Sequence, residues 1–219
     1  MPEHPDDPTA QPFTWDNALI ESTVIKNTLQ FSCYPFPHPA IVVGNGSFLP
    51  REIRLEKIVR DHIPVYRRQG GGCAVFLDKG CLIVSTAFPA EGFSGIRSFF
   101  TRCTHWLIMG LNRTGINGIY PDGISDLVVD NHKIGGSCLK RSKDLAYFSA
   151  SILVSTDLDR MGDYLEHPPR EPEYRKGRAH HDFVRNLSHY YHGITVQDLS
   201  LCLEETLESE FPAAGPCHI

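Results

Sequence analysis

The sequence lacks the features of several large classes of protein. No apolar run in its 219 residues approaches the eighteen or so that a membrane-spanning helix needs. The first twelve residues contain neither the basic nor the apolar segment of a secretory signal, so we expect a cytoplasmic protein. Lys and Arg total 21 against 26 Asp and Glu, a net charge of −5, so there is no overall positive charge to collect nucleic acid or anionic lipid. We expect neither nucleic acid nor a membrane as a partner.

Cysteine is present without the pattern of a disulfide framework or a zinc knuckle. The seven cysteines are an odd number, and they form no Cys-x-x-Cys pair, so we expect free thiols. The histidines cluster only between residues 180 and 192, where they form no i, i+4 pair on a clear helix. We interpret this cluster as a solvated polar loop in preference to a metal site.

The composition is that of a globular protein, with 41% hydrophobic and 21% charged residues. The pattern of predicted helices and strands indicates an α+β fold, with a central mixed β-sheet flanked by helices. We expect Val24 and Ile25 on the apolar stripe of the first helix, and Val59 on that of the second. Helices are predicted from residue 16 to about 29, at 51–61 and 94–111, from 157 to the proline pair at 168–169, and at 195–211. Strands are predicted at 40–44, 63–68, 73–77, 81–88, 126–130, 132–140 and 145–154.

The domain organisation follows from the same patterns. Four prolines and no periodicity in residues 1–12 predict a flexible N-terminal tail, residues 13–212 form one domain, and residues 213–219 form a C-terminal tail. Between two of the predicted helices, residues 168–187 are dense in charge, proline and histidine. This segment is a candidate lid or a partner-facing loop that leads into a short helix.

The stretch RRQGGGCAVFLDKG, residues 67–80, has two arginines and three consecutive glycines between two expected strands. Glycine lacks a Cβ atom and tolerates positive φ, so backbone N–H groups in such a loop can approach a carboxylate or phosphate closely. Arg67 or Arg68 would supply positive charge. A glycine-rich hairpin with solvated arginines is an equal alternative for this stretch alone. A Walker loop is excluded, because its Gly-Lys-Ser/Thr ending is missing.

A second stretch, SDLVVDNHKIGGSCLKR at residues 125–141, has a lysine after an apolar strand and one residue before two glycines. A lysine amine held there by the sheet can polarise a carbonyl oxygen or neutralise a phosphate. The alternative is a hairpin lysine in solvent.

In this order and at this separation, the two stretches resemble the motifs of the lipoate-protein ligases, within the biotin and lipoate protein ligase fold. The first motif of that family is Arg-Arg-x-Ser-Gly-Gly-Gly-Ala-Val-Phe/Tyr-His-Asp-x-Gly-Asn. The second is Asn-Asp-Leu-Val-Val, followed by Arg-Lys-x-Ser/Gly-Gly-Ser/Asn-Ala, and the resemblance continues over about residues 16–211. The matching residues are Arg67, Arg68, Gly71, Gly72, Ala74, Val75, Phe76, Asp78 and Gly80, then Asp126, Leu127, Val128, Val129, Lys133, Gly136 and Ser137.

The resemblance implies an enzyme that activates lipoate with ATP and Mg²⁺ as lipoyl-AMP and transfers the lipoyl group to a lysine of a lipoyl domain or GcvH-like carrier protein. Lys133 matches the motif lysine and would be the catalytic residue, stabilising the developing oxyanion. Arg68, Gly71 and Gly72 would cradle the acyl carbonyl and phosphate, and Asp126 would help to place the metal or the incoming amine. The other expected substrate- or nucleotide-binding residues are Cys73, Ala74, Val75, Asp78, Gly135, Gly136 and Ser137.

The sequence also departs from the motifs. Gly70 and Cys73 replace the serine and the third glycine, Cys81 replaces the asparagine, and Leu77 and Phe148 stand where the family has histidines. Leucine and phenylalanine can neither hydrogen-bond nor titrate. The chain also ends soon after the last predicted helix. This implies a short form that lacks the accessory domain and either works with a separate accessory ligase subunit or transfers from preformed lipoyl-adenylate.

Two alternative functions follow from these departures. Cys73, Cys81 and Cys138 would flank the groove, as a thiol-dependent octanoyl or lipoyl acyltransferase of the same fold requires, although both positions where such enzymes carry their nucleophile lack a cysteine here. Buried packing thiols are the preferred interpretation. The lost histidines would also suit a non-catalytic lipoyl-binding partner subunit.

Overall fold

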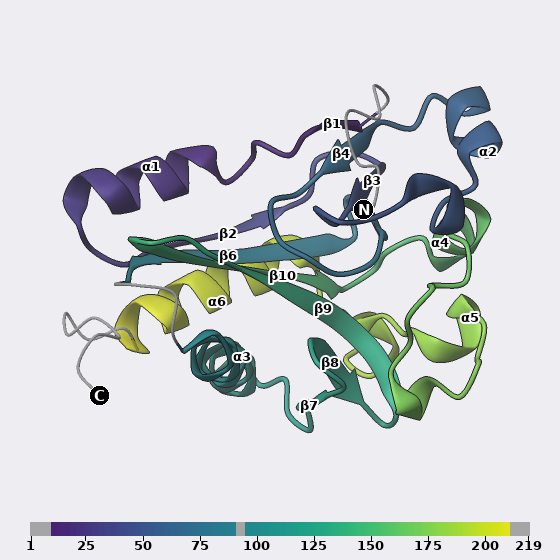
Figure 1. Ribbon diagram of the computed structural model, residues 1–219. Helices are drawn as coiled ribbons and strands as arrows, with labels where there is room; N and C mark the ends of the chain where they lie inside the picture. Colours follow the sequence, from purple (N-terminus) through teal and green to yellow (C-terminus); the bar gives the residue numbers. More distant parts are fainter. Residues whose placement is uncertain (1–9, 91–94, 211–219) are drawn as a thin grey trace.

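The computed structural model describes residues 10–90 and 95–210, and its strands divide into two sheets (Figure 1). In the smaller sheet, β1-β4-β3-β5, strand β4 pairs in parallel with β1 and β3, whereas β3 and β5 are antiparallel. All pairs in the larger sheet, β2-β6-β10-β9-β8-β7, are antiparallel. The strands are β1 (Ala10–Pro12), β2 (Gln30–Pro35), β3 (Ala40–Val43), β4 (Val65–Arg67), β5 (Val75–Leu77), β6 (Cys81–Pro89), β7 (Tyr120–Asp122), β8 (Asp126–Val129), β9 (His132–Arg141) and β10 (Leu145–Leu153).

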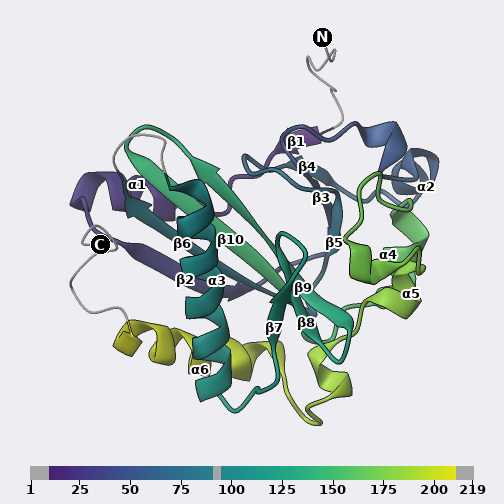
Figure 2. The same ribbon diagram turned by 60° about the horizontal axis from the view of Figure 1, so that its bottom comes forward.

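Helices flank both sheets, which confirms the predicted α+β class. Helix α1 covers one face of the larger sheet, and α3 and α6 cover the other (Figures 1 and 2). Helices α2, α4 and α5 lie on the side of the smaller sheet. The helices are α1 (Asn17–Lys26), α2 (Leu55–Arg60), α3 (Ile96–Arg113), α4 (Leu158–Tyr164), α5 (His180–Phe183) and α6 (Val196–Glu210), with 3₁₀ turns at Leu49–Arg51, Glu173–Arg175 and Leu187–His189.

Two hydrophobic cores share strand β6. Side chains alternate between the faces of a strand, so Leu82 and Val84 belong to different faces from Cys81 and Ile83. The first pair packs into the core under α3 and α6, and the second pair packs into the core of the smaller sheet. Strand β6 therefore joins the two sheets into one folded unit.

Three residues that were expected on apolar stripes are exposed instead. Val24 and Ile25 are 64% and 83% exposed, because α1 buries only Thr23, whose Oγ1 donates to the carbonyl oxygen of Ala87. The second predicted helix is interrupted after a 3₁₀ turn, and α2 begins only at Leu55. Helix α2 buries Ile58, and the adjacent Val59 points to solvent and is 61% exposed.

The N-terminal boundary also differs from the expected one. Residues 10–12 of the expected tail form β1, which pairs with β4 through backbone hydrogen bonds, so these residues belong to the fold. The rest of that tail and the expected C-terminal tail at 213–219 lie outside the described residues. At the other end, Thr195 caps α6, its Oγ1 accepting from the N–H of Asp198 at 3.1 Å.

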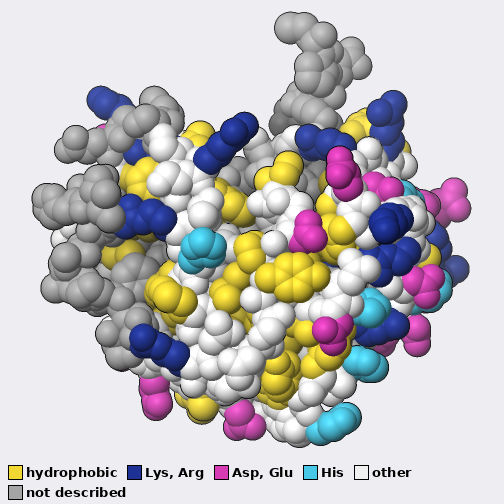
Figure 3. All heavy atoms as spheres, turned by 90° about the horizontal axis from the view of Figure 1, so that it is seen from below, with side chains coloured by type: hydrophobic (Ala, Val, Ile, Leu, Met, Phe, Trp, Pro, Cys, Tyr) yellow, Lys and Arg dark blue, Asp and Glu magenta, His cyan; other side chains and the backbone are white. Residues whose placement is uncertain are grey.

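The molecular surface differs in character from one side to the other. Seen from below in Figure 3, hydrophobic side chains gather across the middle of the face, and charged and histidine side chains gather toward the side of α4 and α5. At the β7–β8 turn, Ile124 is 91% exposed. None of the helices in the described part of the chain is long and apolar enough to cross a bilayer.

Candidate functional site

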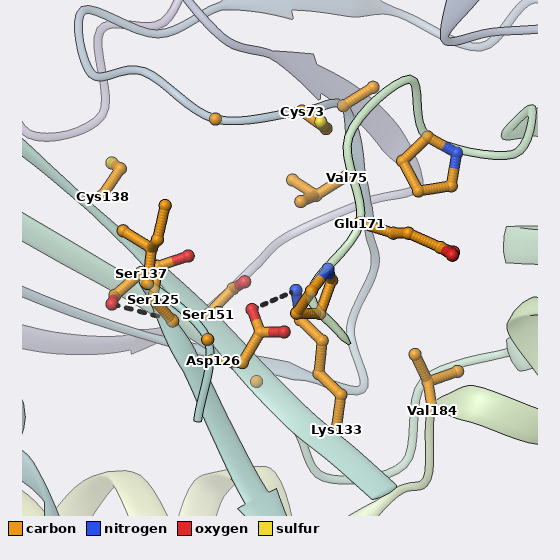
Figure 4. Close-up of a pocket in the computed structure, with 18 of the residues that line it drawn as sticks. Cys73, Val75, Ser125, Asp126, Lys133, Ser137, Cys138, Ser151, Glu171 and Val184 are labelled. Carbon is orange, nitrogen blue, oxygen red and sulfur yellow. Dashed lines mark hydrogen bonds and ion pairs between the residues drawn. The ribbon is translucent and has the colours of Figure 1, made fainter. Parts of the chain in front are cut away.

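A cavity of about 520 Å³ lies between the glycine loop that precedes β5, the strands β8 to β10, and the segment 168–184. Inside it, Lys133 Nζ lies 2.7 Å from Asp126 Oδ1, and the two side chains point toward one another (Figure 4). The second carboxylate oxygen, Oδ2, accepts from the hydroxyl of Tyr174 at 2.8 Å. Burial and the charge of Asp126 raise the pKa of Tyr174, so this hydroxyl remains a donor. The lysine is thereby held in one place by a buried carboxylate.

A β-bulge turns Lys133 into the cavity. Strand β8 pairs Leu127 with Gly135 but Val128 with Lys133, so Ile134 is the extra residue. In a regular ladder Ile134 would stand opposite Val128, on the cavity side. The bulge instead leaves Ile134 fully buried in the core under α3 and α6 and exchanges it for the lysine. The local shift in register thus decides which of the two neighbours faces the cavity.

The glycine loop is held in shape by side chains that face away from the cavity. Glu52 is 6% exposed, and its Oε2 accepts from the N–H of Ala74 at 2.6 Å and from Ser47 Oγ at 3.0 Å. Arg68 donates to the carbonyl oxygens of Gly71 and Cys73 at 2.8 and 2.9 Å. These hydrogen bonds fix the wall before a ligand arrives.

The opposite wall is the segment that the sequence marked as a candidate lid. It is tied to the strands near the lysine, since Val184 forms a β-bridge with Lys133 and the N–H of Arg185 donates to the Lys133 carbonyl oxygen at 2.9 Å. Within this wall Arg175 is only 4% exposed. Its Nη2 has no hydrogen-bond partner among the described residues, and such a buried unpaired donor costs about 1–3 kcal/mol.

The same wall carries His180, which lines the cavity. Burial, and then the charges of Arg175, His167 and Lys133, lower the pKa of His180 to about 4. The interpretation of this histidine as part of a solvated loop is therefore wrong. At pH 7 the imidazole of His180 in the cavity is therefore neutral.

This shift predicts an acid dependence of stability. In the unfolded chain, His180 titrates near its ordinary pKa of about 6.5 and therefore binds a proton more readily than in the folded chain. The stability that this difference contributes is complete above pH 6.5 and is lost as the pH falls toward 4. We expect His180→Gln to lose less unfolding free energy than the wild type between pH 6.5 and 4.5, measured by urea denaturation. His181→Gln, at an exposed position of the same short helix, is the control. Identical pH profiles for wild type and His180→Gln would contradict the prediction.

The structure brings together nearly all of the expected site residues. Lys133 and Asp126 lie in the cavity, whereas Arg68 lines only a smaller adjoining hollow and braces the loop. Asp78 lines neither hollow, because its oxygens accept from the N–H groups of Gly80 and Asp157 and shape a turn. The other expected residues that line the cavity are Gly71, Gly72, Cys73, Ala74, Val75, Gly135, Gly136 and Ser137.

The departures from the motifs lie mostly in the cores. Leu77 and Phe148 are 3% and 0% exposed, so neither side chain replaces a histidine inside the main cavity. Cys81 is fully buried beside Thr156 and does not line the main cavity, contrary to expectation. Cys73 and Cys138 do line it. All six cysteines of the described chain are free thiols, as predicted.

The residues do not fit a metal ion held by the protein. Both oxygens of Asp126, the expected ligand, are already engaged by Lys133 and Tyr174. The described residues contain no group of three or more His, Cys, Asp or Glu side chains that could hold an ion. Asp126 is therefore a partner of Lys133 and Tyr174 in this arrangement and not a metal ligand.

Comparison with known proteins identifies the family. The model of the lipoyl protein ligase A/B catalytic domain matches residues 8–208, and the chain belongs to this family. It is 28% identical over 177 residues to a lipoate–protein ligase of Streptococcus pyogenes, a match that covers 76% of this chain and 51% of the relative. It is 26% identical over 171 residues to lipoate-protein ligase A of Psychrobacter cryohalolentis, covering 78% and 49%. The chain thus spans about half the length of these curated relatives.

Solved structures share the fold. A putative lipoate protein ligase from Thermoplasma acidophilum with bound lipoic acid superposes with a TM-score of 0.74 at 19% identity, covering 90% of this chain and 78% of that one. A lipoate-protein ligase A bound with ATP gives 0.76 at 19% identity, covering 94% and 83%. A bi-partite lipoate protein ligase from T. acidophilum, described with its E2 lipoyl domain, gives 0.73 at 18% identity, covering 95% and 86%.

Proposed function

We propose that the chain catalyses lipoyl transfer: a lipoyl group, carried as lipoyl-AMP, passes to the lysine of a lipoyl carrier domain. The observation that carries the proposal is Lys133, turned into the cavity by a bulge and held 2.7 Å from a buried carboxylate. Family membership and the ligands of the structural neighbours, lipoic acid and ATP, support the same assignment. The catalytic unit would comprise residues 13–212 together with β1.

The chemistry of the cavity suits the second half of such a reaction. The acceptor lysine would attack the acyl carbonyl with its neutral ε-amine, forming the C–N bond, and the bond from carbon to the phosphate oxygen would break to release AMP. The proton that the nitrogen loses would leave with the phosphate of AMP or pass to solvent. Negative charge develops on the carbonyl oxygen, and the ammonium of Lys133 would stabilise it. Asp126 would orient that ammonium, while Arg68 and Glu52 would keep the glycine loop in place.

The proposal also includes the formation of lipoyl-AMP, as a step that can be divided between two subunits. ATP would donate the adenylyl group and release pyrophosphate, with Mg²⁺ arriving on the nucleotide phosphates and not on a preformed protein site. The bi-partite archaeal ligase of the same fold supports a division of this work between subunits. An accessory ligase subunit and an acceptor such as a lipoyl domain or GcvH-like protein are therefore the expected partners.

A mass-shift assay tests the proposal. The protein would be incubated with an apo lipoyl-domain protein and either lipoate, ATP and Mg²⁺ or preformed lipoyl-adenylate, and the acceptor would be weighed. Added lipoyl mass from lipoyl-adenylate is the expected result. Mass added from lipoate and ATP as well would show intrinsic adenylation. No added mass from either donor would refute the proposed activity and leave a non-catalytic lipoyl-binding subunit.

The thiol-dependent alternative has less support. The thiolate is the nucleophile in such enzymes, and a depressed pKa favours it. Burial instead raises the pKa of Cys73 and Cys138, and it raises that of Cys81 to about 12.

We accordingly expect Cys73→Ser combined with Cys138→Ser to retain most of the transfer from lipoyl-adenylate. Serine keeps the size of the side chain but is a far weaker nucleophile. The acceptor mass assay measures the transfer, and intact-protein mass spectrometry of the wild type checks for an acyl adduct on a cysteine. Abolished transfer in the variant, together with such an adduct in the wild type, would establish the acyltransferase instead.

A further inference from the structure

The cationic groups of the cavity differ in how far they are neutralised. Lys133 forms an ion pair with Asp126 at 2.7 Å, so its charge is already largely balanced. Arg175 has no such close partner, since Glu171 Oε2 lies 3.5 Å from its Nε, on an exposed side chain that also accepts from His167 at 2.9 Å. Arg170 also lines the cavity but is exposed to solvent, so the buried excess of positive charge on this wall lies at Arg175.

The guanidinium of Arg175 is held rigidly except at one end. Its Nε donates to the carbonyl oxygen of Arg178 at 2.9 Å, and its Cζ lies 4.7 Å from the centroid of the Phe183 ring. These contacts fix the plane of the group. Its Nη2 is shielded from solvent and lacks a hydrogen-bond partner among the described residues, although the side chain lines the cavity. A fixed plane with a free donor is the geometry with which arginine receives an oxyanion.

Neighbouring groups are consistent with an unbalanced positive charge at this point. Burial lowers the pKa of Arg175, and burial together with Arg175 lowers that of His180 to about 4. An anion placed beside the guanidinium would relieve both effects. Tyr174, the preceding residue, bonds to Asp126, so the arginine is tied through the backbone to the Lys133 pair.

We propose that Arg175 binds the oxyanion of the acyl donor, its guanidinium donating to a carboxylate or phosphate oxygen at the segment 168–184. This inference rests on the proposed function and adds a residue that the glycine motifs do not contain. The shared chemistry is a negatively charged oxygen: the carboxylate of a free acyl chain or the phosphate of its adenylate. Lys133 would then act on the acyl carbonyl, while Arg175 anchors the charged group beside it.

Titration calorimetry on the whole chain tests this with four probes: lipoate, AMP, lipoyl-adenylate and the neutral lipoamide. We expect Arg175→Met to weaken lipoyl-adenylate binding about 10- to 100-fold, the loss of one charge-assisted hydrogen bond. A matching loss for lipoate identifies the carboxylate, and one for AMP identifies the phosphate. Binding of lipoamide should not change. Lys176→Met is the matched control, because Lys176 is the next residue of the same segment, is exposed and does not line the cavity.

The outcomes separate the possible roles of the arginine. Equal losses for lipoamide and lipoyl-adenylate would assign Arg175 a packing role and overturn the inference, as would unchanged binding of every probe. If circular dichroism shows that Arg175→Met does not fold, Arg175→Lys replaces it: the charge remains but the planar fork is lost, so a selective, smaller loss for the anionic probes is expected. Wild-type protein that binds neither lipoate nor lipoyl-adenylate would refute the proposed function along with the inference, whereas failure of Arg175 alone would leave that function standing.

Discussion

Replacing Lys133 by methionine should lower acyl transfer from lipoyl-adenylate by roughly two to three orders of magnitude. Methionine keeps much of the unbranched stem but removes the ammonium that would stabilise the oxyanion. The initial rate of mass gain on the acceptor domain measures the effect. Lys140→Met is the matched control, because Lys140 lies on the same strand, bonds to Gln69, and does not line the cavity. Transfer at the wild-type rate in Lys133→Met would remove the main support for the proposed mechanism.

The ion pair between Lys133 and Asp126 means that Lys133→Met also lowers stability. From the sequence alone, a lysine beside two glycines faces a groove, and its loss should barely affect folding. In the structure, Lys133 balances the charge of Asp126, which is 6% exposed, and removing one partner of such a pair destabilises a protein by about 3–5 kcal/mol when the pair is fully buried. Lys133 is itself partly exposed, so a smaller loss is expected. Combining Lys133→Met with Asp126→Asn removes the unpaired charge, and this variant should regain stability without regaining transfer.

Gly44→Ala should produce the second large effect, a loss of both stability and transfer. A Cβ atom at Gly44 would lie 2.0 Å from the carbonyl oxygen of Gly72, a backbone atom that can move away only with the whole glycine loop. A displaced loop misplaces the acyl donor, and an error of about 1 Å can cost 10²-fold in rate. Forcing an extra methyl group into a packed site costs about 1–3 kcal/mol.

Gly46→Ala provides the control for this change. Gly46 lies two residues away, does not have positive φ, and has no atom within 4 Å of the added Cβ. It should keep the stability and transfer rate of the wild type. Thermal unfolding and the acceptor mass assay measure both variants. An unaffected Gly44→Ala variant would show that the loop is not held as closely as the contact with Gly72 requires.

The sequence predicts the site to the extent that local patterns determine it. The two glycine motifs predicted that the glycine loop and Lys133 face a ligand, because glycines adjoining a strand end leave room for one. In the structure the loop and Lys133 line the same cavity. The orientation of the lysine depends on the bulge at Ile134, which no local pattern in β9 indicates. Asp78 matched a motif, yet its backbone partners Gly80 and Asp157 use both of its oxygens.

Long-range packing explains what the sequence could not predict. Val24 is exposed because α1 meets the sheet along a narrow line, a property of the partner surface and not of the helix. The charge and proline content of residues 168–187 marked this segment as a candidate lid, but did not indicate which of its residues line the cavity. Arg175 became a candidate only when tertiary contacts buried it and left one donor unpaired.

The fit between Gly70 and Cys138 links two motifs that are far apart in the chain. A Cβ atom at Gly70 would lie 2.7 Å from the sulfur of Cys138, so the thiol occupies space that a side chain at position 70 would need. The motifs that this sequence resembles have serine at the first position and alanine at the second, which is the opposite division of the same volume. The two positions therefore constrain each other during divergence: a larger residue fits at position 70 only after position 138 has changed to a smaller one.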